Sequence, residues 1–80
     1  MFKEGQILNI NGEKGIICFV TEFNNSVYIN VSFGEEQFNF RVYRVEIEGS
    51  EAVFFEEKNN DILQELYAIF VSNSIFGEIA

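Results

Sequence analysis

Turn signals recur about every ten residues along this chain and separate short apolar segments from one another. Asn11-Gly12 is the strongest of these signals, because both residues tolerate the positive φ that a two-residue hairpin turn requires. Between the turns, as in residues 27–33, apolar and polar residues alternate, so that one face of each strand is apolar. Short strands at this spacing are typical of an all-β sheet. We predict strands over residues 6–10, 15–23, 27–33, 37–48 and 52–56.

The alternation changes phase within the predicted fourth strand. Apolar residues occupy even positions up to Val42 and odd positions from Tyr43 onward. A shift of one residue predicts a β-bulge near these two residues. The bulge would bend the strand, so that it serves both halves of a curled sheet.

A periodicity of three to four residues follows the last predicted strand and forms one apolar helical stripe. Residues of N-cap type precede the stripe, and Asp61 with Gln64 has the spacing of a capping box. We predict a helix over residues 61–72, packed across the open face of the sheet or closing the end of a barrel. Residues 75–77 would then dock on the sheet or hang free. The stripe consists of Leu63, Leu66, Tyr67 and Phe70.

These patterns predict an α+β fold that is mainly β. The expected architecture is a five-stranded antiparallel meander, curled into a half-barrel or a small SH3-like barrel, with one C-terminal helix. Short hairpin connections make sequential strands pair with one another. Eighty residues suit a single domain over residues 1–80, and ten phenylalanines supply a dense core.

The residue types that most catalysis depends on are scarce in this chain. It has no histidine, which is the usual proton-transfer side chain and the commonest metal ligand. Its one cysteine, Cys18, lies in an apolar run, so we expect it to be a buried, unreactive side chain. The sequence therefore predicts a protein that is not an enzyme, with no catalytic, cofactor-binding or metal-ligating residues and no cofactor.

Five basic residues stand against thirteen acidic ones, which gives a net charge of −8. Direct nucleic-acid binding needs a basic face, so we do not expect it here. Arg41 and Arg44 lie on either side of the predicted bulge and could share a face. Glutamates such as Glu35 or Glu51 are their expected cross-strand partners.

The acidic residues are concentrated between residues 35 and 65, where nine acids and three bases carry six of the eight net negative charges. Glu46 and Glu48 share a strand face, about 6.6–7 Å apart, which is close to the spacing of phosphates along a nucleic acid. Such a row could imitate a phosphate backbone, or it could be a solvated edge that discourages aggregation. The candidate partner-binding residues are Glu46, Glu48, Glu51, Glu56, Glu57 and two aromatic residues that we expect to be exposed, Tyr28 and Tyr43.

Four sequence features follow one another between residues 12 and 70. They are a glycine turn into an apolar strand (12–16), an alternating strand with a Gly-Glu-Glu turn (28–36), an aromatic-Arg-Val strand (40–46), and a strand end before a helix (54–66). In these features the chain resembles the YrzB-like family of small acidic bacterial proteins of unknown function. The resemblance implies a soluble cytoplasmic protein and assigns no catalytic residues.

The leading functional prediction is a non-enzymatic protein–protein interaction module, whose partner could have a basic surface. The alternative is a nucleic-acid mimic of phage or mobile-element type that inhibits a nuclease or another DNA- or RNA-binding protein. No run approaches the length of a membrane span and no leader segment is evident, so we expect a cytoplasmic protein. A homo-oligomer stays open, because the apolar residues Ile75, Phe76 and Ile79 could seal a dimer.

Overall fold

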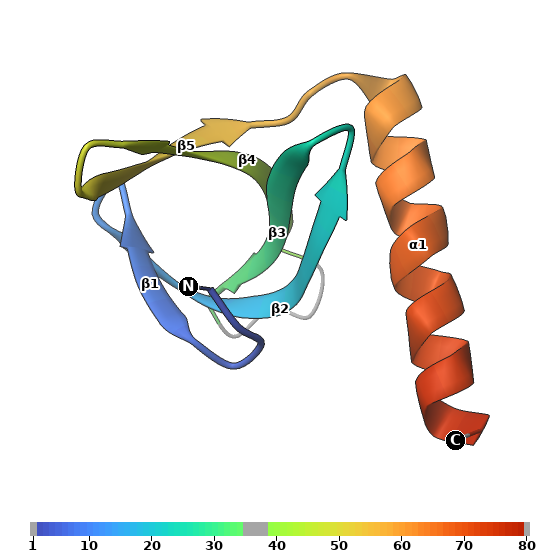
Figure 1. The fold of residues 1–80 in the computed structure, drawn as a ribbon. Helices are drawn as coiled ribbons and strands as arrows, with labels where there is room; N and C mark the ends of the chain where they lie inside the picture. Colours follow the sequence, from blue (N-terminus) through green and yellow to red (C-terminus); the bar gives the residue numbers. More distant parts are fainter. Residues whose placement is uncertain (1, 35–38, 80) are drawn as a thin grey trace.

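The computed structural model of the chain is a five-stranded antiparallel sheet curled into a half-barrel, followed by one helix (Figure 1). It describes the backbone of residues 2–34 and 39–79 and the side chains of residues 2–34 and 39–72. The strands lie in chain order, so each pairs with its sequence neighbours. The predicted fold class is thereby confirmed in its half-barrel form. The elements are β1 (Ile7–Ile10), β2 (Glu13–Phe23), β3 (Ser26–Phe33), β4 (Phe40–Glu48), β5 (Glu51–Glu56) and α1 (Asn60–Ile79).

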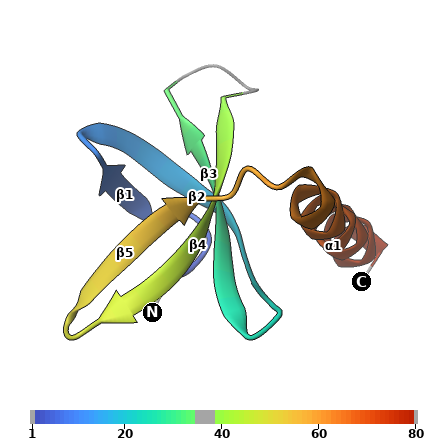
Figure 2. The ribbon, with the colours of Figure 1, turned by 90° about the horizontal axis from the view of Figure 1, so that it is seen from above.

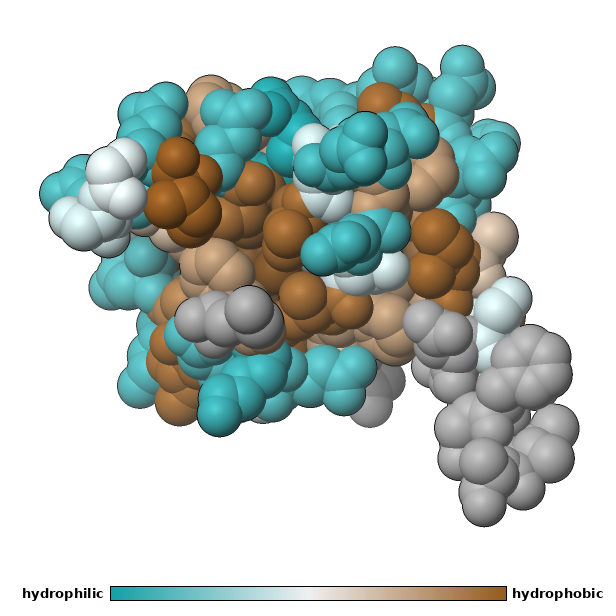
Figure 3. Space-filling view, viewed as in Figure 1, coloured by the Kyte–Doolittle hydropathy of each residue, from teal (hydrophilic) through white to brown (hydrophobic). Residues whose placement is uncertain are grey.

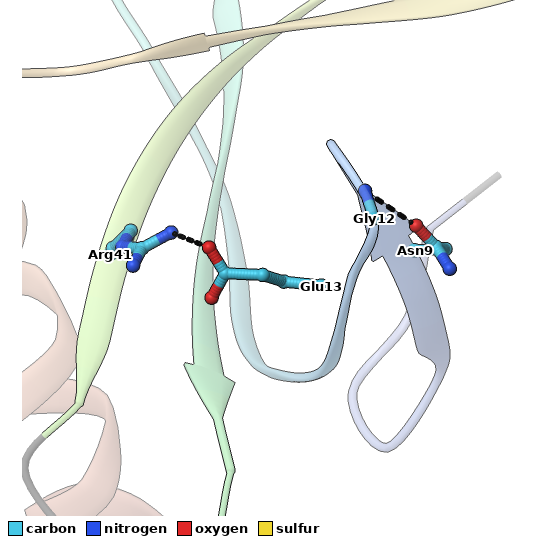
Figure 4. Close-up of polar contacts among 4 residues, drawn as sticks. All are labelled: Asn9, Gly12, Glu13 and Arg41. Atoms are coloured by element: carbon cyan, nitrogen blue, oxygen red, sulfur yellow. Dashed lines mark hydrogen bonds and ion pairs between the residues drawn. The ribbon is translucent and has the colours of Figure 1, made fainter.

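The hairpin turns use the residues that tolerate a left-handed backbone. Asn11 and Gly12 have φ values of 53° and 85° between β1 and β2, as the sequence predicts, and Asn24 and Asn25 have 51° and 63° between β2 and β3. The side chain of Asn9 accepts a hydrogen bond from the Gly12 backbone N–H at 3.0 Å (Figure 4). These two-residue turns hold the strands in the register that forms the meander.

A β-bulge is present, but it lies in β2 and not in β4. Ile17 pairs with Val31 and Phe19 pairs with Asn30, so Cys18 has no residue opposite it. The pairing of β4 with β3 and β5 has no register shift, so the prediction of a bulge near residues 42–43 was wrong. The extra residue reverses the alternation of β2, so that side chains beyond it change faces.

The phase change in β4 has a different cause, because both faces of this strand are covered. Val42 belongs to a buried cluster with Leu66 and Phe70 of the helix. Tyr43 and Val45 belong to the cluster inside the half-barrel. Adjacent residues that point to opposite faces are therefore both buried, which imitates a shift in the alternation.

The main core fills the hollow of the half-barrel. Its fully buried members include Ile29 and Val31 from the inner face of β3, and Phe2 packs its ring edge against Phe54 at 5.7 Å between ring centres. Since Phe2 comes from the N-terminal segment and Phe54 from the edge strand β5, this contact links the chain terminus to the sheet. Burying side chains of this size contributes roughly 1.5–3 kcal/mol each.

The helix packs on the outer face of the curled sheet and does not close an end of it (Figure 2). Leu66 and Phe70 bury their side chains against Tyr28 and Val42, and the Phe70 ring lies 4.6 Å from that of Phe19. The contacts come from the predicted apolar stripe, although its member Tyr67 is exposed. The amphipathic pattern therefore sets which side of the helix meets the sheet.

Both ends of the helix differ from the prediction. The side chain of Asn59 accepts a hydrogen bond from the Asp61 N–H at 3.0 Å, so Asn59 is the N-cap and the predicted capping box of Asp61 with Gln64 is wrong. The helix also continues past residue 72 to Ile79, because serine and asparagine lower helix propensity by only a few tenths of a kcal/mol. The tail at 75–77 therefore belongs to α1, and its side chains lie outside the described ones.

Candidate functional site

Three predicted site residues lie together on the outer face of the β4–β5 hairpin. Glu46 and Glu48 are two residues apart on β4, and Glu51 of β5 lies directly opposite Glu48. A period of two puts alternate residues on one face, so the shared face of Glu46 and Glu48 predicted from the sequence is confirmed. All three side chains are exposed. We call these three residues the acidic hairpin face.

Arg44 reduces the charge at one end of the acidic hairpin face. Its guanidinium forms an ion pair with Glu46 of the same strand and lies 4.8 Å from the centre of the Phe55 ring. Glu51, one of the partners predicted for the arginines, is therefore not the partner of Arg44. Among the described residues, no ion pair involves Glu48 or Glu51, so the two carboxylates of this face without an ion pair lie beside the Gly49-Ser50 turn.

Glu56 and Glu57 do not join this face. Glu56 lies opposite Tyr43 and so has the parity of the inner face. Glu57 is half-buried and accepts a hydrogen bond from the Tyr28 hydroxyl at 3.3 Å. Burial raises the pKa of Tyr28 above its ordinary value, and the Glu57 carboxylate raises it further. Glu57 thus has a structural partner inside the domain.

Tyr28 and Tyr43 are buried, so the prediction that they are exposed aromatic residues was wrong. Each is only 4% exposed, because Tyr28 lies under the helix and Tyr43 lies in the hollow of the half-barrel. Sequence alternation assigns them to opposite faces but does not reveal that both faces are covered. The exposed aromatic residues of the described part are Phe40, Phe55 and Tyr67.

Arg41 and Arg44 point to opposite faces of β4, contrary to the prediction that they share one. With no bulge between them, Arg41 keeps the inner-face parity of Tyr43. It forms an ion pair with Glu13 at 3.1 Å (Figure 4). Its guanidinium carbon also lies 4.7 Å from the centre of the Phe33 ring. The ion pair lies beside the β1–β2 turn, because Glu13 is the first residue of β2. The other partner predicted for the arginines, Glu35, lies outside the described residues.

Cys18 is exposed, although the sequence predicts a buried side chain. It is the extra residue of the bulge in β2, so it follows neither the inner nor the outer row of that strand. An apolar run alone cannot reveal this, because the sequence does not say which residue a bulge leaves unpaired.

The other end of the half-barrel holds an apolar pocket of about 580 Å³, which we call the mouth pocket. Figure 2 shows the N-terminus and the β2–β3 and β4–β5 turns at this end, with the β1–β2 turn at the opposite one. Figure 3 shows apolar side chains gathered in the middle of the face above the hollow, with hydrophilic ones around them. The pocket was not predicted from the sequence, although the alternating apolar residues of several strands indicate an apolar inner face. Its lining residues are Phe2, Val20, Glu22, Val27, Val45, Ile47, Ser50 and Ala52.

In the part of the chain that the structure describes, no group of three or more cysteine, aspartate and glutamate side chains is arranged to hold a metal ion. No helix over residues 2–34 and 39–79 combines the length and hydropathy of a membrane span. Comparisons with protein-family models, curated proteins and solved structures find no match to this chain. The resemblance to the YrzB-like family therefore stays a prediction.

Proposed function

We propose that this protein is a non-enzymatic module that binds a basic surface of a protein partner through its acidic hairpin face. The observation that carries the proposal is the register of Glu48 with Glu51. It places two exposed carboxylates directly opposite each other at the tip of a hairpin, with Glu46 on the same face.

Electrostatics gives this arrangement a use in binding. Like charges directly opposite each other on neighbouring strands destabilise a sheet. A lysine or arginine of a partner placed between Glu48 and Glu51 would relieve this repulsion. The net charge of −8 would also steer a basic partner toward the protein before contact.

A paired charge reversal tests the proposal. Glu48→Lys with Glu51→Lys is compared with Glu4→Lys with Glu65→Lys, which makes the same change in net charge at exposed positions elsewhere. Each protein is immobilised, and the proteins captured at low salt are quantified by mass spectrometry. We expect a partner that wild type and control retain and that the hairpin variant loses. Equal capture by the hairpin variant would refute the proposal.

The nucleic-acid mimic has less support from the same geometry. A mimic needs a long row of free carboxylates, whereas this face has three and Arg44 pairs with one of them. Adding duplex DNA to the captured complex separates the two functions. A mimic occupies the groove that binds DNA and is displaced, whereas a partner bound outside such a groove is retained.

A further inference from the structure

The mouth pocket and the acidic hairpin face are two sides of the same hairpin. Val45, Ile47 and Ala52 line the pocket with their side chains on the inner face of β4 and β5. Glu46 and Glu48 alternate with Val45 and Ile47 along β4, so they point to the outer face. A partner segment that crosses the hairpin tip therefore meets carboxylates on one side and an apolar hollow on the other.

The pocket is apolar and has room for a side chain. Six of its eight lining residues are apolar, and its volume of about 580 Å³ lies within the range of ligand pockets. Ile47 on its wall is 66% exposed, the largest value among the exposed large apolar residues that the structure describes. A wall left this open resembles a groove for a protein segment more than an enclosed site for a free small molecule.

One carboxylate stands in this apolar lining. Glu22 lies opposite Val27, in the row that continues to Val45 on the inner face. Without the bulge at Cys18, the alternation of β2 would turn Glu22 to the outer face. The bulge thus brings a negative charge to the pocket. Glu22 is exposed, and no ion pair to it is found among the described residues.

From these three observations we propose that the mouth pocket takes an apolar side chain of the partner and that Glu22 binds a lysine or arginine beside it. The inference rests on the proposed function and specifies the partner's chemistry. The partner presents a basic segment with an apolar residue in it. Glu22 discriminates against acidic segments, and the apolar walls favour a leucine-like side chain over a polar one.

Two short peptides probe the pocket directly: acetyl-Lys-Lys-Leu-Lys-Lys-amide and the same peptide with serine in place of leucine. Each is titrated into ¹⁵N-labelled protein and followed by the amide resonances. We expect the leucine peptide to bind about tenfold or more tightly than the serine peptide, because it alone buries a large apolar side chain. The shifts should include the amides of Val20, Val27 and Val45. Equal affinity of the two peptides would overturn the inference.

Matched variants assign the effect to the pocket. Ile47→Ser should abolish the preference for leucine, whereas Val71→Ser, a change at an apolar residue of the helix that is 57% exposed, should keep it. Glu22→Gln should weaken the binding of both peptides, and Glu65→Gln, at an exposed residue of the helix, should not. Far-ultraviolet circular dichroism checks that each variant is folded. A preference that survives Ile47→Ser contradicts the proposal, as do shifts of the same size with N-acetyl-leucine amide, since that result would assign the pocket to a small free ligand.

The same titration separates this inference from the proposed function. If Glu48→Lys with Glu51→Lys weakens the binding of both peptides and Ile47→Ser leaves the leucine preference unchanged, the proposed function of the acidic hairpin face is supported and the pocket inference is refuted. If Ile47→Ser removes the leucine preference and the paired charge reversal leaves peptide binding unchanged, the pocket inference is supported and the proposed function of the acidic hairpin face is refuted.

Discussion

The hydroxyl of Tyr28 donates a hydrogen bond to Glu57 Oε1 at 3.3 Å, and this contact joins the centre of the sheet to the segment that leads into the helix. Tyr28 lies on β3, and Glu57 directly follows β5. The backbone N–H of Glu57 also donates to the carbonyl of Val42 at 2.8 Å. The segment that leads into the helix is therefore anchored to the sheet by both a side chain and the backbone.

Replacement of Tyr28 by phenylalanine should change stability most at high pH. Burial raises the pKa of Tyr28 above the ordinary value of 10.0, so the unfolded chain loses this proton first and the native state loses stability as the pH rises above about 10. Tyr28→Phe should cost about 0.5–1.5 kcal/mol at pH 7 and flatten the alkaline loss. Urea unfolding between pH 7 and 11.5 measures both effects. Tyr67→Phe, at an exposed tyrosine, should keep the wild-type slope, and the same slope in Tyr28→Phe would contradict the prediction.

Gly15 should not tolerate a side chain. A Cβ atom there would lie 2.5 Å from Val31 Cγ1 and 3.0 Å from the Phe33 ring, and both neighbours are buried. Gly15→Ala should lower the free energy of unfolding by about 1–3 kcal/mol through overpacking. A double-mutant cycle with Val31→Ala tests the cause. The double variant should lose less than the sum of the single losses, and simple additivity would show that the two positions do not clash.

The docking of the helix should depend on Leu66. This side chain is fully buried against the sheet, so Leu66→Ala should cost about 2–5 kcal/mol. Val71→Ala on the same helix should change stability by less than about 0.5 kcal/mol, because Val71 is exposed. Urea midpoints from circular dichroism and from tyrosine fluorescence compare the two variants. Similar losses in both would mean that the contacts of Leu66 do not hold the helix.

Cys18 should react in the folded protein. Its side chain is exposed at the bulge, so Ellman's reagent should titrate about one thiol per chain without denaturant. Cys18→Ser should change stability by less than about 0.5 kcal/mol, as expected for an exposed side chain. A thiol that reacts only after unfolding would contradict the exposed position.

Part of the candidate site was predictable because it depends on local geometry. Alternation along one strand puts Glu46 and Glu48 on one face, and a two-residue turn places Glu51 opposite Glu48. The burial of Tyr28 and Tyr43 was not predictable in this way. Whether a strand face is exposed depends on what packs against it. Tyr28 is covered by the helix and Tyr43 by side chains inside the half-barrel, and most of these residues are distant from the tyrosines in the sequence.

The sequence by itself determined the order and type of the elements, because turn residues and apolar periodicity act over a few neighbouring positions. It therefore specified a meander with one C-terminal helix. Only the tertiary structure decided that the bulge lies at Cys18 and that β4 pairs with β3 and β5 without a register shift. A phase change along a strand has two physical causes, an extra residue or burial of both faces, and contacts with distant residues distinguish them. The same contacts place Glu22 in the mouth pocket.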